Sequence, residues 1–239
     1  MTKTSAVLWD VDTQVDFVLA GGKLAVPGAE GAVPAMRQLV EAARAGGAVH
    51  VASADDHELT DPELSDEPDF VNTYPPHCLR GTPGAEKISE TKQLDPLPLS
   101  HVPFPPGLIP PLIDGRRELL LLKKNFDVFT NPNTAPVLSA LNPAEIVLFG
   151  VATDVCDDAA VLGLLDRGRR VHFVEEASRG LDERRVSTCT ALWRERGVAF
   201  TPLAEAVALL ADGAPVASRP WDHGVSTTSE SPSLISTRR

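Results

Sequence analysis

The sequence predicts a doubly wound α/β fold, with a mainly parallel sheet of five to six strands and helices on both of its faces. Short apolar runs typical of buried strands recur along the chain, and segments with helical apolar spacing lie between most of them. The chain has 239 residues, 43% of them hydrophobic, which is enough for one domain with a substantial core. Strands that alternate with helices form βαβ units, whose strands run parallel.

The strands are predicted from predominantly apolar runs, as expected for strands covered on both faces. Five of them are Ala6–Val11, Ala48–Ala52, Glu118–Leu122, Glu145–Phe149 and Arg170–Val174, and a sixth, short strand is predicted at Val198–Thr201.

The helices are predicted from apolar residues that recur every three to four positions. In the first of them these residues are Val33, Met36, Val40 and Ala43. The predicted helices are Val33–Ala45, Asp154–Arg167, Leu181–Arg196 and Leu203–Ala211.

Two regions interrupt the alternation. The segment from Asp55 to Pro111 is rich in proline and acidic residues, and such long loops inside a compact domain are usually functional or disordered. From about Ala214 the chain is rich in Ser, Thr and Pro and has little periodicity. We therefore expect one domain over residues 1–213 and a flexible C-terminal tail over residues 214–239.

Composition narrows the class of protein. The net charge is -11 and the pI about 5.0, and an acidic surface repels phosphate backbones, so we expect no nucleic acid partner. No apolar run approaches the roughly 20 residues that span a bilayer, and the run at Ala6–Val11 is too short for the core of a signal peptide. Three cysteines do not suggest a disulfide framework, so we expect a cytoplasmic protein with no membrane contact.

The residues that follow the predicted strands are the first candidates for chemistry, because ligands bind beyond the carboxyl ends of strands in an open α/β sheet. Asp12, Asp55 with His57, and Lys123 follow three of the strands, and Cys156 lies at the start of the helix after a fourth. The positive end of that helix would lower the pKa of the Cys156 thiol, and backbone amides of the same turn could bind an oxyanion. The alternative is a buried structural cysteine.

Two of these candidates have a neighbour that competes for the same role. Lys123 would favour a thiolate, but Lys124 is adjacent, and either could instead be a solvated strand end. Asp12 could accept the thiol proton and deliver it to a leaving amine, or it could cap the following turn. Asp10 lies on the same side of the strand, so alternation does not distinguish it from Asp12.

A metal site is predicted from a carboxylate and two imidazoles. Asp55-x-His57 follows the second strand, and His77 lies further along the same acidic loop. This ligand set suits zinc, with iron or manganese as alternatives, and leaves positions open for water and substrate. The alternative is that these loop histidines are solvated.

Four motifs in order resemble the nicotinamidase and isochorismatase-like hydrolases, over about residues 6–201. They are Asp12-x-Gln14-x-Asp16-Phe17, the segment 22–29, the segment 123–129, and Gly150-Val151-Ala152-Thr153-Asp154-Val155-Cys156. The stretch 74–86, which reads Tyr-Pro-Pro-His-Cys-Leu-Arg-Gly-Thr-Pro-Gly-Ala-Glu, looks nicotinamidase-like in particular.

The resemblance implies a role for each matching residue. It implies a triad of Asp12, Lys123 and Cys156, and it selects Lys123 because the family's lysine precedes its phenylalanine by six residues. It also implies a cis peptide at Val151-Ala152, an oxyanion hole of the Ala152 and Cys156 amides, metal ligands Asp55, His57 and His77, and substrate contacts from Phe17, Tyr74 and, more weakly, Phe129.

The activity that the resemblance implies is hydrolysis of nicotinamide to nicotinate and ammonia through a cysteine thioester, by a homo-oligomer that binds a divalent metal. The alternatives are an amidase for another small amide, a vinyl-ether hydrolase of the isochorismatase type, and an inactive binding module. Two departures from the family pattern are Asp56, where an aromatic residue is usual, and Asp157, where a small apolar residue follows the cysteine. They bear on the substrate more than on the reaction type.

Overall fold

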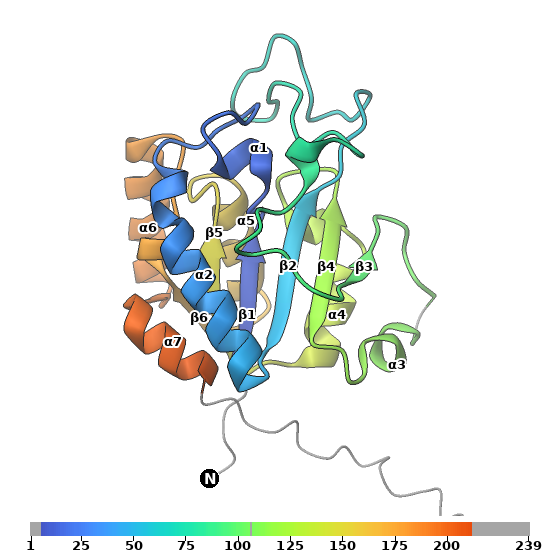
Figure 1. Cartoon of the computed structure of the whole chain (residues 1–239), viewed down its shortest axis with the longest axis vertical. Helices are drawn as coiled ribbons and strands as arrows, with labels where there is room; N and C mark the ends of the chain where they lie inside the picture. The colour runs from blue at the N-terminus through green and yellow to red at the C-terminus, as the bar shows by residue number, and fades with distance from the viewer. Residues whose placement is uncertain (1–5, 106, 212–239) are drawn as a thin grey trace, which may run out of the picture.

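The computed structural model describes residues 6–105 and 107–211, so the predicted tail at 214–239 lies outside the described residues. Within the described part, seven strands form one parallel sheet in the order β3-β4-β2-β1-β5-β6-β7 (Figure 1). The strands are β1 (Ala6–Val11), β2 (Val49–Asp55), β3 (Leu97–Leu99), β4 (Glu118–Lys123), β5 (Glu145–Gly150), β6 (Val171–Phe173) and β7 (Ala199–Phe200).

Helices cover both faces of this sheet, as predicted. In Figure 1, α2 and α7 lie in front of the sheet, and α4 and α5 lie behind it. The α-helices are α1 (Val15–Val18), α2 (Ala29–Gly46), α3 (Ile109–Ile113), α4 (Thr134–Leu141), α5 (Cys156–Leu165), α6 (Glu183–Glu195) and α7 (Leu203–Ala211). Short 3₁₀ turns are η1 (Pro83–Ala85), η2 (Val128–Thr130) and η3 (Glu175–Ala177).

The fold class predicted from the sequence is confirmed, and the sheet has one strand more than expected. The additional strand, β3, lies inside the proline-rich segment and contains Pro98 at its centre. It pairs only with β4 at the edge of the sheet, where a missing backbone N–H is tolerated. This strand was not predicted because it has only three residues and a proline at its centre, so it does not form an apolar run.

The strand register determines which side chains meet at the carboxyl edge of the sheet. Asp55, the last residue of β2, lies opposite Lys123, the last residue of β4, and Val11 of β1 lies opposite Gly150 of β5. The strands β2, β3 and β4, which follow β1 in the chain, all lie on one side of β1 in the sheet, and β5 lies on its other side. The carboxyl edge around β1 is therefore the switch point at which such sheets bind ligands.

The long segment between β2 and β3 folds over this edge. It contains no described α-helix, and its residues 56–82 form the loops at the top of Figure 1. In the part of the chain that the structure describes, every helix is too short or too polar to cross a bilayer.

Candidate active site

The residues predicted for catalysis lie together at the carboxyl edge of the sheet. The Nζ atom of Lys123 is 2.8 Å from Oδ2 of Asp12, contacts Oδ1 of Asp55, and is 3.9 Å from Sγ of Cys156. All four residues are buried. The structure thus places one ammonium between two carboxylates and beside one thiol.

The structure distinguishes Lys123 from Lys124 and Asp12 from Asp10, the two choices that the residues alone left open. Lys124 points away from the thiol, because its Nζ atom contacts the backbone oxygen of Asp56 and lies 3.2 Å from the carboxylate of Asp61. Asp10 pairs with Lys87, at 2.9 Å, and not with Lys123. Lys123 and Asp12 are therefore the pair that faces the thiol.

Asp12 is held in an unusual backbone conformation. Its φ angle is 50°, in the left-handed region that non-glycine residues rarely adopt. The hydroxyl of Ser53 donates to its Oδ1 atom at 2.7 Å, and the amide of Gln14 donates to its carbonyl oxygen at 2.6 Å. The side chain of Gln14 also bridges to β2, since Oε1 accepts from the Asp55 amide at 2.7 Å.

The charges of this group shift one another's pKa values. Burial and the charge of Asp55 raise the pKa of Asp12, although Lys123 opposes them. Burial alone would lower the pKa of Lys123, but Asp12 and Asp55 raise it well above its ordinary value. Lys123 therefore stays protonated, and Asp12 is a better proton acceptor near neutral pH than an exposed aspartate.

The pKa of the Cys156 thiol differs from the prediction. Burial raises the pKa of the Cys156 thiol well above its ordinary value, Lys123 lowers it, and the carboxylates of Asp12 and Asp55 raise it further. The prediction of a lowered pKa was wrong because it considered the helix dipole and Lys123, but neither the burial of the thiol nor the carboxylates around the sulfur. The resting group is a thiol that needs a base, not a standing thiolate.

The turn before α5 brings two backbone amides beside the thiol. The peptide bond between Val151 and Ala152 is cis, as the family resemblance implies. Among the described residues, the amides of Ala152 and Cys156 donate to no other group, whereas the amide of Asp157 donates to the carbonyl oxygen of Ala152 at 3.1 Å. Two free donors are thus available for a developing oxyanion.

Helix α5 begins without a side-chain cap. Its N-cap residue is Val155, which makes no side-chain hydrogen bond to the helix. The carboxylate of Asp154 instead accepts from the amides of Leu181 and Asp182, at 2.7 and 3.2 Å. Asp154 therefore ties the nucleophile turn to the start of α6.

A cluster of four potential metal ligands lies next to Lys123. The three predicted residues, Asp55, His57 and His77, are joined by Glu63, and one ligand atom from each lies within 4.8 Å of the others. Oδ2 of Asp55 is 3.7 Å from Nε2 of His57 and 3.4 Å from Nε2 of His77. Ligands of a tetrahedral zinc ion are about 3.3 Å apart, so a small inward movement would close the site.

Glu63 is a ligand candidate that the sequence did not single out. It is one of several acids in the loop 61–73, and no spacing rule distinguishes it from its exposed neighbours. Burial, together with the charge of Asp55, raises the pKa of Glu63. The cluster therefore holds an excess of negative charge, which a divalent cation would neutralise.

The imidazoles of this cluster are oriented for metal binding. Nδ1 of His57 lies 3.2 Å from the carboxylate of Asp61, and Nδ1 of His77 lies 2.7 Å from the carbonyl oxygen of Pro75. A proton on each Nδ1 leaves the Nε2 lone pairs free to face the cluster. Oδ2 of Asp55 and Nε2 of His57 are buried without a hydrogen-bond partner, as expected of ligands that await a metal.

Replacing Asp61 should weaken metal binding although Asp61 is not itself a ligand. The Asp61→Ala variant loses the acceptor that orients His57, and we expect the affinity for zinc to fall about 10- to 100-fold. Competition with a chromophoric chelator measures this. Asp66→Ala removes the same charge from an exposed position in the same loop and should leave the affinity unchanged. Equal affinities for both variants would contradict the prediction.

A small apolar cavity opens onto the thiol and the metal cluster. Phe17 and Tyr74, both predicted substrate contacts, form part of its wall. The wall also includes Leu24, Val26, Asp55, Glu63, His77, Phe126, Ala152, Val155, Cys156 and Leu181. Most of these side chains are apolar and a few are polar, a composition that is typical of small-molecule sites.

Phe129 lies outside this wall, and Phe126 takes the place expected of it. The ring of Phe129 stacks on Trp9, with the ring centroids 6.5 Å apart, and the guanidinium carbon of Arg167 lies 3.9 Å from the centroid of the Phe129 ring. A Cβ atom on Gly163 would come within 2.2 Å of that ring, so Phe129 fills the space between α5 and the sheet. Phe129 lies within the turn η2, which begins two residues after Phe126, and sequence spacing does not reveal this turn.

Asp157, one of the departures from the family pattern, is fully buried behind the nucleophile turn. Both of its carboxylate oxygens lack a hydrogen-bond partner among the described residues. Burial and the charge of Asp12 raise the pKa of Asp157 well above its ordinary value. The folded protein therefore favours the protonated form of Asp157.

Ionisation of Asp157 should make the fold less stable as pH rises. The carboxyl ionises in the unfolded chain above pH 3.8 but stays protonated in the fold, so unfolding becomes more favourable as pH rises toward the folded-state pKa. We expect Asp157→Asn to increase the free energy of unfolding by at least about 1.4 kcal/mol at pH 8 and by much less at pH 5. Denaturant titrations at both pH values measure this. Asp158→Asn, at a half-buried neighbour that accepts from Trp193, should change stability less. A gain that is independent of pH would contradict the explanation.

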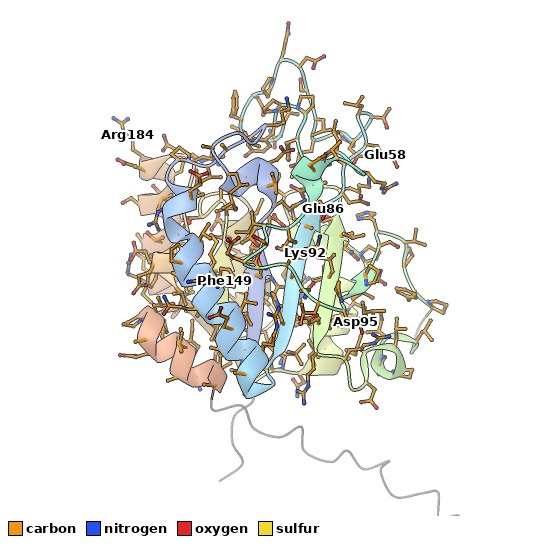
Figure 2. All side chains as sticks on the ribbon, viewed as in Figure 1. Glu58, Glu86, Lys92, Asp95, Phe149 and Arg184 are labelled. Atoms are coloured by element: carbon orange, nitrogen blue, oxygen red, sulfur yellow. The ribbon has the colours of Figure 1, made fainter. Side chains whose placement is uncertain are left out.

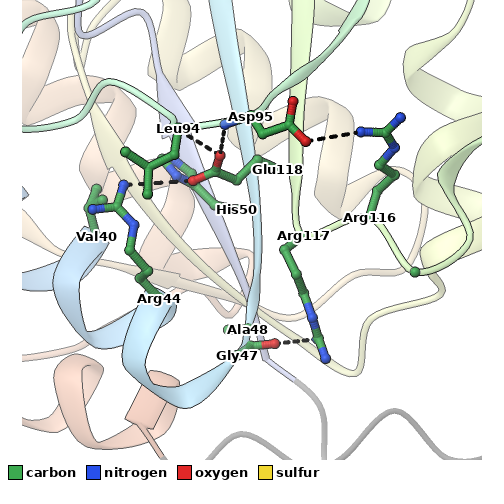
Figure 3. A pocket seen from close by; sticks show the side chains of 11 residues that line it. Val40, Arg44, Gly47, Ala48, His50, Leu94, Asp95, Arg116, Arg117 and Glu118 are labelled. Carbon is green, nitrogen blue, oxygen red and sulfur yellow. Dashed lines mark hydrogen bonds and ion pairs between the residues drawn. The ribbon is translucent and has the colours of Figure 1, made fainter.

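A second hollow lies at the opposite, amino ends of β2 and β4 (Figure 3). Three arginines in its wall already have partners: Arg44 is 3.6 Å from Glu118, Arg116 is 3.4 Å from Asp95, and Arg117 donates to the Gly47 carbonyl. It is far from the thiol along the strands and contains no nucleophile. The candidate active site is thus the cavity at the carboxyl edge.

Sequence comparisons agree with this geometry. A family model described as "Isochorismatase domain" matches residues 6–205. Nicotinamidase of Escherichia coli (strain K12) is 29% identical over 190 residues, which cover 72% of this chain and 82% of that protein. Nicotinamidase/pyrazinamidase of Mycobacterium tuberculosis is 40% identical over 78 residues, and this match spans 32% of this chain and 40% of that protein.

Solved structures share the fold at low sequence identity. The pyrazinamidase of Pyrococcus horikoshii, described in complex with zinc, has a TM-score of 0.64 and 22% identity, and the match covers 83% of this chain and 99% of that one. An isochorismatase family protein of Desulfovibrio vulgaris has a TM-score of 0.68 and 22% identity, with 87% and 99% covered.

Proposed function

The chain belongs to the isochorismatase family, and we propose that it hydrolyses a small carboxamide, with nicotinamide, converted to nicotinate and ammonia, as the leading substrate. The observation that carries the proposal is the buried contact of Lys123 with Asp12, Asp55 and Cys156 at one end of an apolar cavity. A protein gains nothing in stability from burying these charges, since buried ion pairs are costly to desolvate. A catalytic role for these charged groups would explain why they are buried despite the free energy of desolvation.

In the proposed reaction the Asp12 carboxylate accepts the proton of the Cys156 thiol while the sulfur attacks the amide carbon. The former carbonyl oxygen receives hydrogen bonds from the amides of Ala152 and Cys156. Asp12 then gives the proton to the departing nitrogen, the C–N bond breaks, and ammonia leaves a thioester on Cys156. Water attacks the thioester, its proton passes through Asp12 back to the sulfur, and the carboxylic acid is released.

Lys123 balances charge throughout this cycle. Its ammonium stays protonated because Asp12 and Asp55 outweigh the effect of burial on its pKa. It stabilises the negative charge on sulfur when Asp12 takes the proton, and the charge on Asp12 once the proton has left. A fixed cation inside a buried site performs this task without reorganisation of solvent.

The residues that would hold a divalent metal are Asp55, His57, Glu63 and His77, and zinc is the metal that suits this donor set best. A bound metal would supply Lewis acidity for a coordinated nitrogen or oxygen of the substrate and for water. Phe17, Tyr74 and Phe126 would hold an aromatic ring between this cluster and Cys156.

An ammonia-release screen on the zinc-loaded protein tests the proposal, with nicotinamide, pyrazinamide and aliphatic amides as substrates. A kcat/KM that is highest for the aromatic amides would support the assignment. Turnover of aliphatic amides alone would support the proposed amide hydrolysis but contradict nicotinamide as the substrate. If a folded protein with verified metal content releases ammonia from none of these amides, the proposal is overturned. That result would favour a vinyl-ether hydrolase or a binding module.

A further inference from the structure

A second buried charge cluster surrounds Asp10, two residues before Asp12 in the sequence. Asp10, two residues earlier in β1, is fully buried. Nζ of Lys87 lies 2.9 Å from its Oδ1 atom, and Nε2 of His50 lies 3.3 Å from its Oδ2 atom. Burial raises the pKa of Asp10, but Lys87 and His50 together hold it below its ordinary value, so Asp10 is ionised.

This cluster is not required by the fold class. A buried ion pair is often no more stable than apolar residues of the same volume, because both charges must be desolvated. Lys87 belongs to the long loop between β2 and β3, and its side chain is only 6% exposed. A role near the active site would account for a lysine that the loop inserts against the sheet.

Two hydrogen-bonded links run from the cluster to Asp12. The hydroxyl of Thr13, the residue after Asp12, donates to Oδ1 of Asp10 at 2.8 Å. Lys87 also donates to the carbonyl oxygen of Ser53 at 3.0 Å, and the hydroxyl of Ser53 donates to Oδ1 of Asp12 at 2.7 Å. One link holds the backbone of the turn, and the other holds the carboxylate.

Asp12 needs such support because its backbone is in the left-handed region. A non-glycine residue there is higher in energy and persists only where its surroundings hold it. Relaxation of the turn toward ordinary β geometry would move the carboxylate away from Lys123 and Cys156. A displacement of about 1 Å in a catalytic group can lower a rate about a hundredfold.

We propose that Lys87 and Asp10 form a positioning unit that fixes the Asp12 carboxylate for proton transfer with Cys156. The inference rests on the proposed function in that Asp12 is taken as the proton acceptor. Neither Lys87 nor Asp10 belongs to the wall of the apolar cavity. The unit therefore affects the step that Asp12 performs, and not the binding of substrate or metal.

The test is the double variant Asp10→Asn/Lys87→Met, which removes both charges together and leaves no unpaired ion. The asparagine oxygen can still accept from Thr13, so the fold should survive. We expect kcat to fall about tenfold or more, with KM and bound zinc within about twofold of the unchanged protein. Thr13→Val is the second variant: it breaks the backbone link, keeps the ion pair, and should lower kcat several-fold.

Lys92→Met is the matched control. Lys92 forms an exposed ion pair with Glu86, at 2.6 Å, on the same loop (Figure 2). Exposed pairs contribute little, so the same substitution there should leave kcat unchanged. If the double variant and Thr13→Val both fold and keep the wild-type kcat, the positioning role is refuted.

A second readout separates this inference from the proposed function. The rate at which iodoacetamide alkylates Cys156, followed by peptide mass spectrometry, depends on proton removal from the thiol and requires no turnover. We expect this rate to fall at least several-fold in the double variant and in Thr13→Val, and to be unchanged in Lys92→Met. Unchanged alkylation in both test variants would refute the unit even if no amide proves to be a substrate, whereas inactivity of the wild-type protein on all amides would refute only the proposed function.

Discussion

Replacing Cys156 with alanine should lower the rate of ammonia release by at least about 10⁴-fold, because the variant has no atom that can form the thioester. The carboxylates and the ammonium of the site remain, so substrate and zinc should still bind. The measurements are kcat on the amide identified by the screen, zinc content, and binding of the same amide by calorimetry.

The control for this variant is Cys189→Ala. Cys189 is also buried, but its thiol donates to the backbone oxygens of Thr153, before α5, and Val186, on α6, and Cys189 does not line the cavity. We expect its activity to stay within a few-fold of the unchanged protein. Turnover by folded Cys156→Ala at a rate near that of the control would exclude Cys156 as the nucleophile.

Replacing Lys123 with methionine should have the largest effect on stability together with a near-complete loss of activity. Methionine fills much of the same space but leaves Asp12 and Asp55 buried without their shared cation. Removal of one partner from a buried ion pair costs about 3–5 kcal/mol, so we expect the free energy of unfolding to fall by that amount. Denaturant titration with and without zinc measures it, and zinc should restore part of the loss because a dication partly compensates the buried negative charge.

Lys124→Met is the matched control for the neighbouring lysine. The side chain of Lys124 is 22% exposed and contacts Asp61 and the Asp56 carbonyl, so its loss should cost about 1 kcal/mol or less and leave kcat within a few-fold. Equal destabilisation by the two substitutions would show that the buried ammonium of Lys123 does not hold the two carboxylates together.

The sequence alone was sufficient for the parts of the site that lie next to regular strands. Apolar runs locate the strands, and a parallel sheet brings their carboxyl ends to one edge. Asp55 and Lys123 are the last residues of β2 and β4, and Asp12 and Cys156 follow β1 and β5 within a few residues. Local patterns decide such positions, since strand ends differ by at most three residues between the expectation and the structure. The exception, β3, has a proline where an apolar run was sought.

Tertiary structure decided the features that depend on distant segments. Glu63 joins the metal cluster, and Phe126 instead of Phe129 enters the cavity wall, because loops turn in ways that spacing does not encode. The choice of Lys87 as partner for Asp10 joins residues 77 positions apart.

The protonation state of Cys156 also depends both on local sequence and on distant segments of the chain. The helix start that should favour a thiolate is a local property, and α5 does begin at Cys156. The pKa is raised instead because burial and the charges of several carboxylates act on the sulfur at once. The pKa of a group depends on every charge and dipole within several ångströms, wherever these lie in the chain. The sequence therefore identified the residues of the site and their order, whereas the folded structure determined which of them are ionised.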